Sequence, residues 1–243
     1  MIQTTEAVIL KSFPYSDSSL IVKAYTKDFG LQSYILRSAR SNKGKTTKAQ
    51  HFQPLRLVQL ELSSNPKARL HSIKSSALML CCDDTSCNIV KTTLAIFMTE
   101  VLNLSIKENT ANEELFEFLK RQIDTLEQAE SNSLAEFHLH FLLSLGAILG
   151  FEPFDNHDSQ TPFFDTIGGK FVSTPSNHDT LDSETSFKLH KLLQSHRKAS
   201  PEKVTCNRNE RKAHLEALIR FYAIHITDGR MMKSQDILGI VLS

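Results

Sequence analysis

The sequence has few cysteines, and their spacing excludes the two kinds of site that cysteines most often build. The four are Cys81, Cys82, Cys87 and Cys206, and no two of them form a Cys-x-x-Cys pair. Structural zinc sites and disulfide frameworks need a regular cysteine pattern, so we expect neither, and we predict no metal site and no cofactor. Buried, reduced thiols are the expected state of these side chains.

Long hydrophobic runs are lacking as well. No run approaches the roughly 18 apolar residues of a membrane-spanning helix, and residues 1–6 are not a basic segment followed by an apolar core. The chain has 243 residues, of which 40% are hydrophobic and 23% charged, so it is long enough for one or two domains with a buried core. We therefore expect a cytoplasmic protein without a membrane partner.

Acidic residues are scarce in the first third of the chain. The first 77 residues hold twelve Lys and Arg but only four Asp and Glu, a net charge of +8, while the remainder carries −7. This division indicates nucleic acid, or another polyanion, as the partner of the first part. The cations are densest at residues 37–48, where there are five and no carboxylate. Such a loop is either a solvated, mobile connection or an arm that follows a phosphate backbone.

Short β-prone segments separated by turn signals fill residues 4–76. They are predicted at residues 5–10, 20–25, 31–36, 55–62 and 68–76, and the fourth alternates apolar and polar side chains as a half-buried strand does. Pro14 is expected to follow the end of the first strand. Five strands in about 75 residues predict an OB-fold barrel over residues 1–78, an architecture that binds oligonucleotides.

From Ser86 onward the apolar spacing is helical, which predicts an all-helical domain over residues 79–243 and an α+β fold for the chain. Capping boxes are predicted at residues 110–113 and 133–136, ahead of two helices. The second of these helices is apolar on most sides, so it should be the centre of a bundle and end at Gly150. Residues 154–180 are expected to be loop-like.

Other functions have weaker support. Residues 39–46 match a phosphate-binding P-loop except that Ala39 replaces the first glycine, and the segment up to Pro54 is too short for the helix that a nucleotide hydrolase needs. We find no nucleophile with a recognisable base and expect no enzyme. An RNA-binding OB module stays open. Aromatic residues such as Phe13 and Tyr15 interleave with the charges and could stack on bases, although core packing is the commoner role of each.

Particular segments resemble the RecO family, bacterial recombination mediators that act in DNA repair. Residues 6–22 and 25–30 resemble the first hairpin of that family, with a Pro-Tyr turn followed by an acid and serines. Residues 37–40 lie where the family has a basic Lys-Gly-Ala-Arg segment, and residues 53–55 where it has Gln-Pro-Phe. Residues 149–153 are similar to its Gly-aromatic-x-Pro segment, and residues 229–234 to its closing Lys-Ser motif. Many members follow the Gly-aromatic-x-Pro segment with two Cys-x-x-Cys pairs that hold zinc, and this sequence has no cysteine there. The resemblance is therefore to a zinc-free version, in which residues 154–180 are held by packing or stay mobile.

The resemblance implies a mediator of the RecFOR pathway that works on DNA at the nucleoid. It implies binding of single- and double-stranded DNA, and annealing of complementary strands coated by single-stranded-DNA-binding protein. It also implies RecR as a partner in loading the RecA recombinase. The helical domain is expected to recruit proteins, including the acidic C-terminal tail of the single-stranded-DNA-binding protein. The candidate phosphate contacts are first Arg37, Arg40, Lys43, Lys45 and Lys48, and next Lys11, Lys23 and Lys27.

Overall fold

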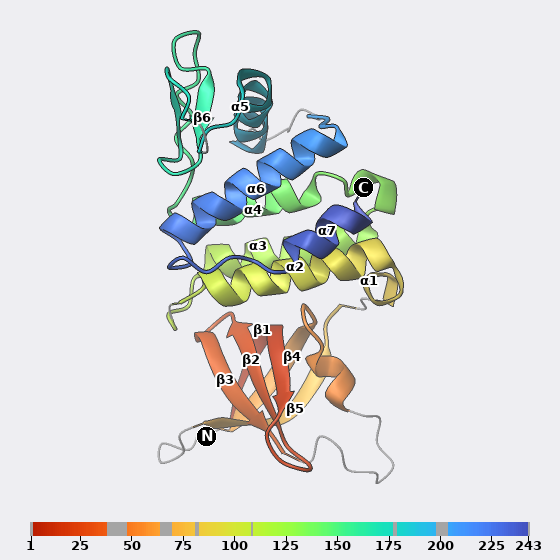
Figure 1. Ribbon diagram of the computed structural model, residues 1–243. Helices are drawn as coiled ribbons and strands as arrows, with labels where there is room; N and C mark the ends of the chain where they lie inside the picture. Colours follow the sequence, from red (N-terminus) through yellow and green to blue (C-terminus); the bar gives the residue numbers. More distant parts are fainter. Residues whose placement is uncertain are drawn as a thin grey trace. The chain divides into compact units, whose positions relative to one another are not determined.

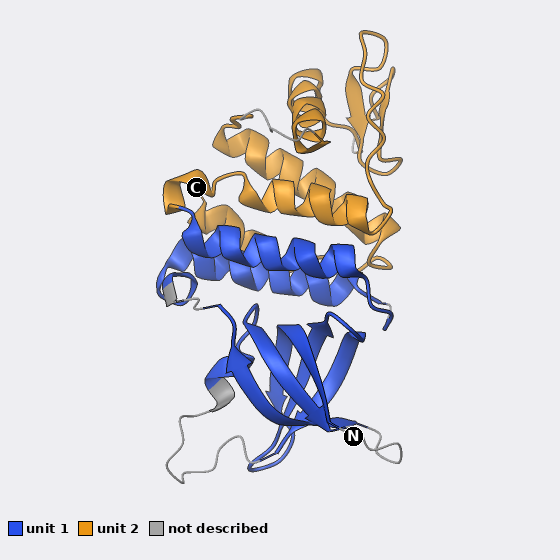
Figure 2. Cartoon of the chain, turned by 180° about the vertical axis from the view of Figure 1, so that it is seen from behind, with its two compact units in different colours: residues 1–129 blue, residues 130–243 orange. Residues whose placement is uncertain are grey.

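The chain forms two compact units, residues 1–129 and residues 130–243 (Figure 2). The computed structural model describes residues 2–37, 48–63, 70–80, 83–107, 109–176, 179–197 and 204–242. Unit 1 contains a barrel and the helices α1 to α3, and unit 2 contains the helices α4 to α7 and a small sheet (Figure 1). The last barrel strand ends at residue 78, where the sequence predicts a domain boundary. The division into domains at that residue stays a prediction.

Unit 1 begins with a closed barrel of five strands in the order β1-β2-β3-β5-β4. The strands are β1 (Ile2–Pro14), β2 (Leu20–Thr26), β3 (Gly30–Leu36), β4 (Leu57–Ser63) and β5 (His71–Leu78). Neighbouring strands are antiparallel except for β3 and β5, which pair in parallel over three residues. The predicted OB-fold is confirmed, since the five strands close into a barrel in this order.

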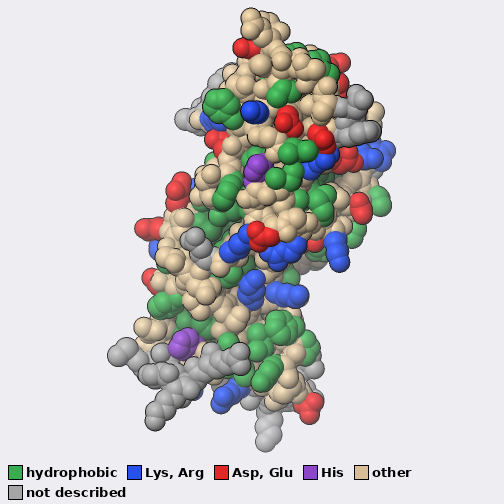
Figure 3. Space-filling model, turned by 60° about the vertical axis from the view of Figure 1, so that its left-hand side comes forward, with side chains coloured by type: hydrophobic (Ala, Val, Ile, Leu, Met, Phe, Trp, Pro, Cys, Tyr) green, Lys and Arg blue, Asp and Glu red, His purple; other side chains and the backbone are tan. Residues whose placement is uncertain are grey.

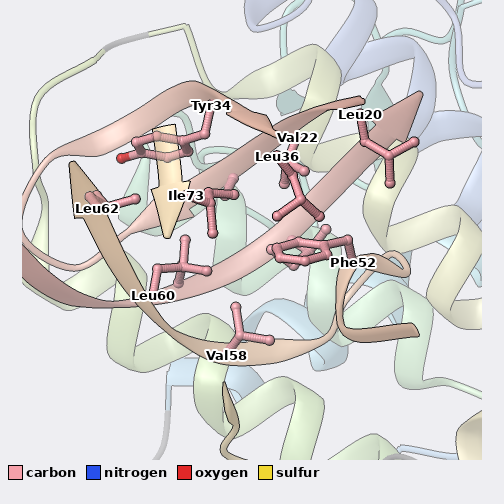
Figure 4. Packing of buried hydrophobic residues seen from close by; sticks show 12 residues of the cluster. Leu20, Val22, Tyr34, Leu36, Phe52, Val58, Leu60, Leu62 and Ile73 are labelled. Carbon is pink, nitrogen blue, oxygen red and sulfur yellow. The ribbon is translucent and has the colours of Figure 1, made fainter. Parts of the chain in front are cut away.

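Alternate side chains of each strand point into the barrel and form its core. This core cluster includes Leu20 and Val22 of β2, Leu36 of β3 and Leu60 of β4 (Figure 4). The short 3-10 helix η1 (Lys48–Phe52) adds Phe52, which is fully buried in the same cluster. The segment after the basic loop is thus a five-residue 3-10 helix that packs on the barrel core through Phe52. It is not the α-helix that a P-loop requires.

Several strand boundaries differ from the prediction; for example, β1 starts at Ile2 rather than at residue 5, and β4 at Leu57 rather than at residue 55. β1 continues through Pro14, because a proline at the last residue of a strand removes no hydrogen bond that the ladder needs. β5 begins at His71 rather than at residue 68, and residues 64–69 lie outside the described ranges.

Three helices follow the barrel in unit 1: α1 (Asp83–Cys87), α2 (Ile89–Ser105) and α3 (Glu113–Gln128). Lys91 of α2 has only 1% of its side chain exposed and holds them together. Its ammonium group pairs with the Asp84 carboxylate of α1 and donates to the Glu127 carbonyl of α3 at 2.6 Å. The predicted capping box at residues 110–113 is wrong, since Asn112 is the N-cap of α3 and accepts from the Leu115 amide at 3.0 Å.

The barrel is joined to α3 by polar contacts at one end. Lys27 pairs with Glu117 at 3.3 Å, and Lys120 of α3 pairs with Glu6 of β1 at 3.1 Å. The turn between β2 and β3 also approaches the segment before α3 closely. Gly30 has a φ of +63°, and a Cβ added there would lie 2.5 Å from the Thr110 carbonyl oxygen.

Unit 2 is built around α4 (Phe137–Ile148), which is buried on most sides, as predicted. The other elements are β6 (Phe163–Asp165), β7 (Lys170–Val172), α5 (Ser183–Arg197), α6 (Arg208–His225) and α7 (Gln235–Val241). The Tyr222 hydroxyl of α6 donates to the Leu142 carbonyl of α4 at 2.6 Å. The predicted cap at residues 133–136 is not formed, because α4 starts at Phe137 and the Glu136 side chain makes no cap bond. Gly150 ends α4 with a φ of +79°, as predicted.

Residues 154–180 contain a β-hairpin, β6 and β7, where the sequence predicts a loop. Phe164 of β6 and Phe171 of β7 have buried side chains, and the Asn156 side chain makes two hydrogen bonds to the backbone of Phe171. His157 stacks on His190 of α5 with ring centroids 4.7 Å apart. Side-chain packing therefore holds the described part of this segment.

Across the described ranges there is no cluster of three His, Cys, Asp or Glu residues suited to a metal. Their helices are too short or too polar to cross a membrane.

We predict that Gly30→Ala destabilises the protein more than Gly150→Ala does. Both substitutions force a side chain into a left-handed backbone conformation, which costs about 1–2 kcal/mol. At Gly30 the new methyl group also overlaps the Thr110 carbonyl, which raises the loss to roughly 2–4 kcal/mol. Nothing lies within 4 Å of a Cβ at Gly150. Urea unfolding of both variants measures the difference, and equal losses would contradict the close approach of barrel and α3.

Candidate nucleic-acid interface

A β-bulge in β1 changes which side chains face outward from the barrel. Ile9 pairs with Ala24 of β2, whereas Lys11 pairs with Lys23, so Leu10 is an extra residue in the ladder. Paired residues of antiparallel strands point to the same side, and a bulge re-aims the side chains that follow it. After Leu10 the odd-numbered residues of β1 therefore turn from the core to the outer surface.

Before the bulge, the outward side chains are covered by the helices of unit 1. Val8 pairs with Tyr25, and both are almost completely buried. The Tyr25 hydroxyl donates to the Asn112 carbonyl at 3.4 Å and accepts from the Asn112 amide at 3.1 Å. Asn103 of α2 donates to the Leu10 carbonyl at 3.2 Å. This half of the outer surface is an internal packing surface.

Beyond the bulge, the outer surface of β1, β2 and β3 carries two parallel rows of side chains. The polar row is Lys11, Lys23 and Ser33, and the apolar row is Phe13, Ile21 and Ile35. We call these six residues the open barrel face. On the barrel in Figure 3, hydrophobic side chains gather in a patch with Lys and Arg side chains near it.

The polar row places two lysines directly opposite each other. Like charges at such cross-strand positions repel each other, and Lys11 faces Lys23 in this register. A phosphate backbone bound across the two strands offsets this repulsion and releases its condensed counterions. The arrangement therefore favours a polyanionic ligand.

Arg37 lies at the end of β3, beyond the apolar row and apart from the two lysines. It follows the last residue of β3 and is exposed to solvent. The candidate residues Arg40, Lys43 and Lys45 lie outside the described ranges. Lys48 begins η1, and its side chain is likewise not described.

Lys27 is not brought to the open barrel face with Lys11 and Lys23. Its ammonium group lies 3.3 Å from the Glu117 carboxylate and 3.8 Å from that of Glu113. The hydrogen bond to Glu117, and then the negative charge of that carboxylate, raise the pKa of Lys27 above its usual value. The positive charge of Lys27 is already compensated by α3.

The structure divides the interleaved aromatic residues into two groups. Tyr25, Tyr34 and Phe52 are buried, whereas Phe13 is 43% exposed and Tyr15, in the turn between β1 and β2, is 65% exposed. Ile21, Ser33 and Ile35 were not among the residues that the sequence singled out. The alternation of side chains along the predicted strands could have placed these three residues on the outer surface of the barrel. It could not have shown that this part of the surface is exposed, because the part covered by helices has the same alternation.

Unit 2 contains a cavity of about 310 Å³ between α6 and α7. Its polar wall includes Arg208, Arg211 and Lys212 from the first turns of α6, and its apolar wall includes Leu238 and Ile240 of α7. Arg211 is fixed by hydrogen bonds to the carbonyls of Cys206 (2.7 Å) and Leu242 (3.0 Å). The lining also holds two carboxylates, Asp236 and Glu216, and Glu216 pairs with Lys212 at 3.8 Å. Cations at the start of a helix oppose its dipole, so an acidic and apolar ligand would be drawn to the α6 side of the cavity.

A cysteine and a histidine also meet in unit 2, but they do not form a nucleophile. The Cys206 sulfur lies 3.8 Å from Nδ1 of His214, whose Nε2 donates to the Thr185 carbonyl at 2.8 Å. Burial, followed by the charges of Glu136 and Glu210, raises the pKa of Cys206 to about 11. The thiol stays protonated at neutral pH, and only the thiolate is reactive.

A closed five-stranded barrel in the order β1-β2-β3-β5-β4 places the chain among OB-fold proteins. Comparison with known proteins identifies the family. The model for the N-terminal domain of recombination protein O matches residues 1–80, and the model for its C-terminal domain matches residues 87–235. The chain belongs to the RecO family of DNA repair proteins.

Individual relatives agree with the family match over their full lengths. The chain is 33% identical to the DNA repair protein RecO of Flavobacterium johnsoniae and 31% identical to that of Flavobacterium psychrophilum. Each alignment covers 98% of both chains. The RecO protein of Bacteroides fragilis is 30% identical over 98% of both chains. The resemblance seen in the sequence is confirmed.

Proposed function

We propose that this chain binds single- and double-stranded DNA through the open barrel face and the basic loop at residues 37–48. In this role it anneals complementary strands coated by single-stranded-DNA-binding protein and helps RecR to load RecA. The observation that carries the proposal is the cross-strand pair of Lys11 and Lys23, with Arg37 exposed on the other side of the apolar row. The names of the relatives, which are DNA repair proteins, support DNA as the polyanion.

Annealing requires no covalent step in this proposal. Two complementary strands repel each other through their phosphates, and a cationic surface lowers that repulsion so that the strands can approach. Lys11, Lys23 and Arg37 supply fixed cations for this purpose. Lys27 does not take part, because Glu117 and Glu113 already neutralise it.

The cavity between α6 and α7 is the proposed site for the acidic C-terminal tail of single-stranded-DNA-binding protein. Arg208 and Lys212 are exposed on its rim. Lys212 pairs with Glu216 at 3.8 Å, so a carboxylate of the tail would have to replace Glu216 there, whereas it could pair with Arg208 directly. The apolar wall from α7 can bury a hydrophobic side chain of the same tail. A protein that holds both the tail and the DNA can take over a strand as the coating protein leaves it.

We predict that the double substitution Lys11→Ala and Lys23→Ala weakens the salt dependence of single-strand binding. Each phosphate contact contributes about 0.7 to the slope of log K against log salt. Removal of two contacts should therefore flatten the slope by about 1.4. Fluorescence anisotropy of a labelled oligothymidine at several salt concentrations measures the slope, and annealing of protein-coated complementary strands should slow in parallel.

Lys27→Ala is the matched control for this experiment. It removes a lysine from the same barrel whose charge is already paired with α3, so the salt slope should stay that of the wild type. A change in the Lys27 variant as large as in the double variant would contradict the assignment, as would a wild-type slope in the double variant. Thermal melting of both proteins checks that the barrel is intact.

A separate prediction concerns the α6–α7 cavity. The double substitution Arg208→Ala and Lys212→Ala should weaken binding of an acidic peptide with an apolar C-terminus about tenfold or more, because it removes two charge-assisted contacts. Calorimetric titration measures this dissociation constant. Lys191→Ala is the control, since Lys191 is exposed on α5 and does not line the cavity. Equal affinity in all three proteins would rule out this site.

A further inference from the structure

The two rows of the open barrel face suggest how the protein distinguishes a single strand from a duplex. We propose that Phe13, with the neighbouring Tyr15, stacks on unpaired bases, while Lys11 and Lys23 hold the phosphates of the same strand. This inference rests on the proposed function and adds a specificity-determining role for the apolar row. If this is so, the duplex that annealing produces is bound by the polar row only and is released.

The spacing of the rows fits one strand of nucleic acid lying across the sheet. Side chains on one face of a strand repeat every two residues, which places the rows about 7 Å apart. Lys11 and Phe13 share β1, and Lys23 and Ile21 share β2, so the two rows run together across both strands. A strand that crosses them presents phosphates to one row and bases to the other. Its bases then lie toward the β1–β2 turn and its phosphates toward the bulge.

The exposure of the aromatic side chains supports a ligand with flat, apolar faces. Phe13 is 43% exposed and Tyr15 is 65% exposed, whereas Ile21, beside Phe13 in the register, is almost buried. Aromatic side chains beside a cationic row form stacking platforms for bases and accept any sequence, because every base has such a face. The two lysines make a purely apolar protein partner a poor match for the same surface.

A duplex cannot use the apolar row in this way. Its base faces are stacked inside the helix, and only base edges are accessible from its grooves. Its phosphates remain available to Lys11 and Lys23. Single strands thus gain from both rows and duplexes only from the lysines. When a bound strand pairs with its complement, its bases leave Phe13 and the product dissociates more readily than either reactant.

The test compares two variants with three ligands of equal length: an oligothymidine, an oligomer of abasic sites and a duplex. Phe13→Ala should weaken oligothymidine binding about tenfold, the size of one lost base stack. It should leave the dissociation constants of the abasic oligomer and the duplex within about twofold of wild type. Lys23→Ala should weaken all three by similar factors. Anisotropy titrations at one fixed salt concentration measure all nine constants, wild type included.

Phe13→Tyr is a third variant, which keeps the aromatic ring. It should bind oligothymidine as the wild type does, which separates stacking from any loss of folding in Phe13→Ala. The inference is overturned if Phe13→Ala weakens all three ligands equally, or if the wild type does not prefer oligothymidine to the abasic oligomer. In either case an effect of Lys23→Ala would leave the proposed DNA site standing. No effect of Lys23→Ala on any ligand would instead reject that site.

Discussion

The structure depends on one irregularity in a β-ladder, the bulge at Leu10 of β1. The outer surface of the barrel is divided in two, because part of it packs against helices and part of it, the proposed binding surface, carries exposed side chains. Before the bulge, Val8 and Tyr25 are buried against α2 and α3. After it, Lys11 and Phe13 face outward. Without the extra residue, the alternation of β1 would turn these two side chains into the barrel core.

The joint between the barrel and α3 complements this division. A barrel lysine, Lys27, pairs with Glu117 and Glu113, and an α3 lysine, Lys120, pairs with Glu6 of the barrel. The Gly30 turn also fits closely against Thr110. Acidic residues of α3 thus compensate cations at one end of the barrel. On the open barrel face one lysine faces another across the strands. The proposed binding surface therefore rests on the placement of these charges more than on the net charge of +8.

Much of the fold could be predicted from the sequence, because strands and helices have different apolar periods. The strand count, the central position of α4 and the stop at Gly150 followed from local patterns. The bulge did not, since it exists only in the register between β1 and β2. The pairing of Lys27 with Glu117 joins residues 90 positions apart, so charge counting alone placed Lys27 among the DNA contacts. The α6–α7 cavity could not be predicted for the same reason, because it requires the packing of two helices.

The central question is which surface of the protein contacts the bases of a bound strand. Photo-cross-linking with oligothymidine that carries 5-iodouracil, followed by mass spectrometry of the attached peptides, answers this directly. The account predicts cross-links to Phe13 and Tyr15, in the segment between the bulge and β2. Cross-links confined to the helices of unit 2, or to the covered side of the barrel around Tyr25, would contradict it.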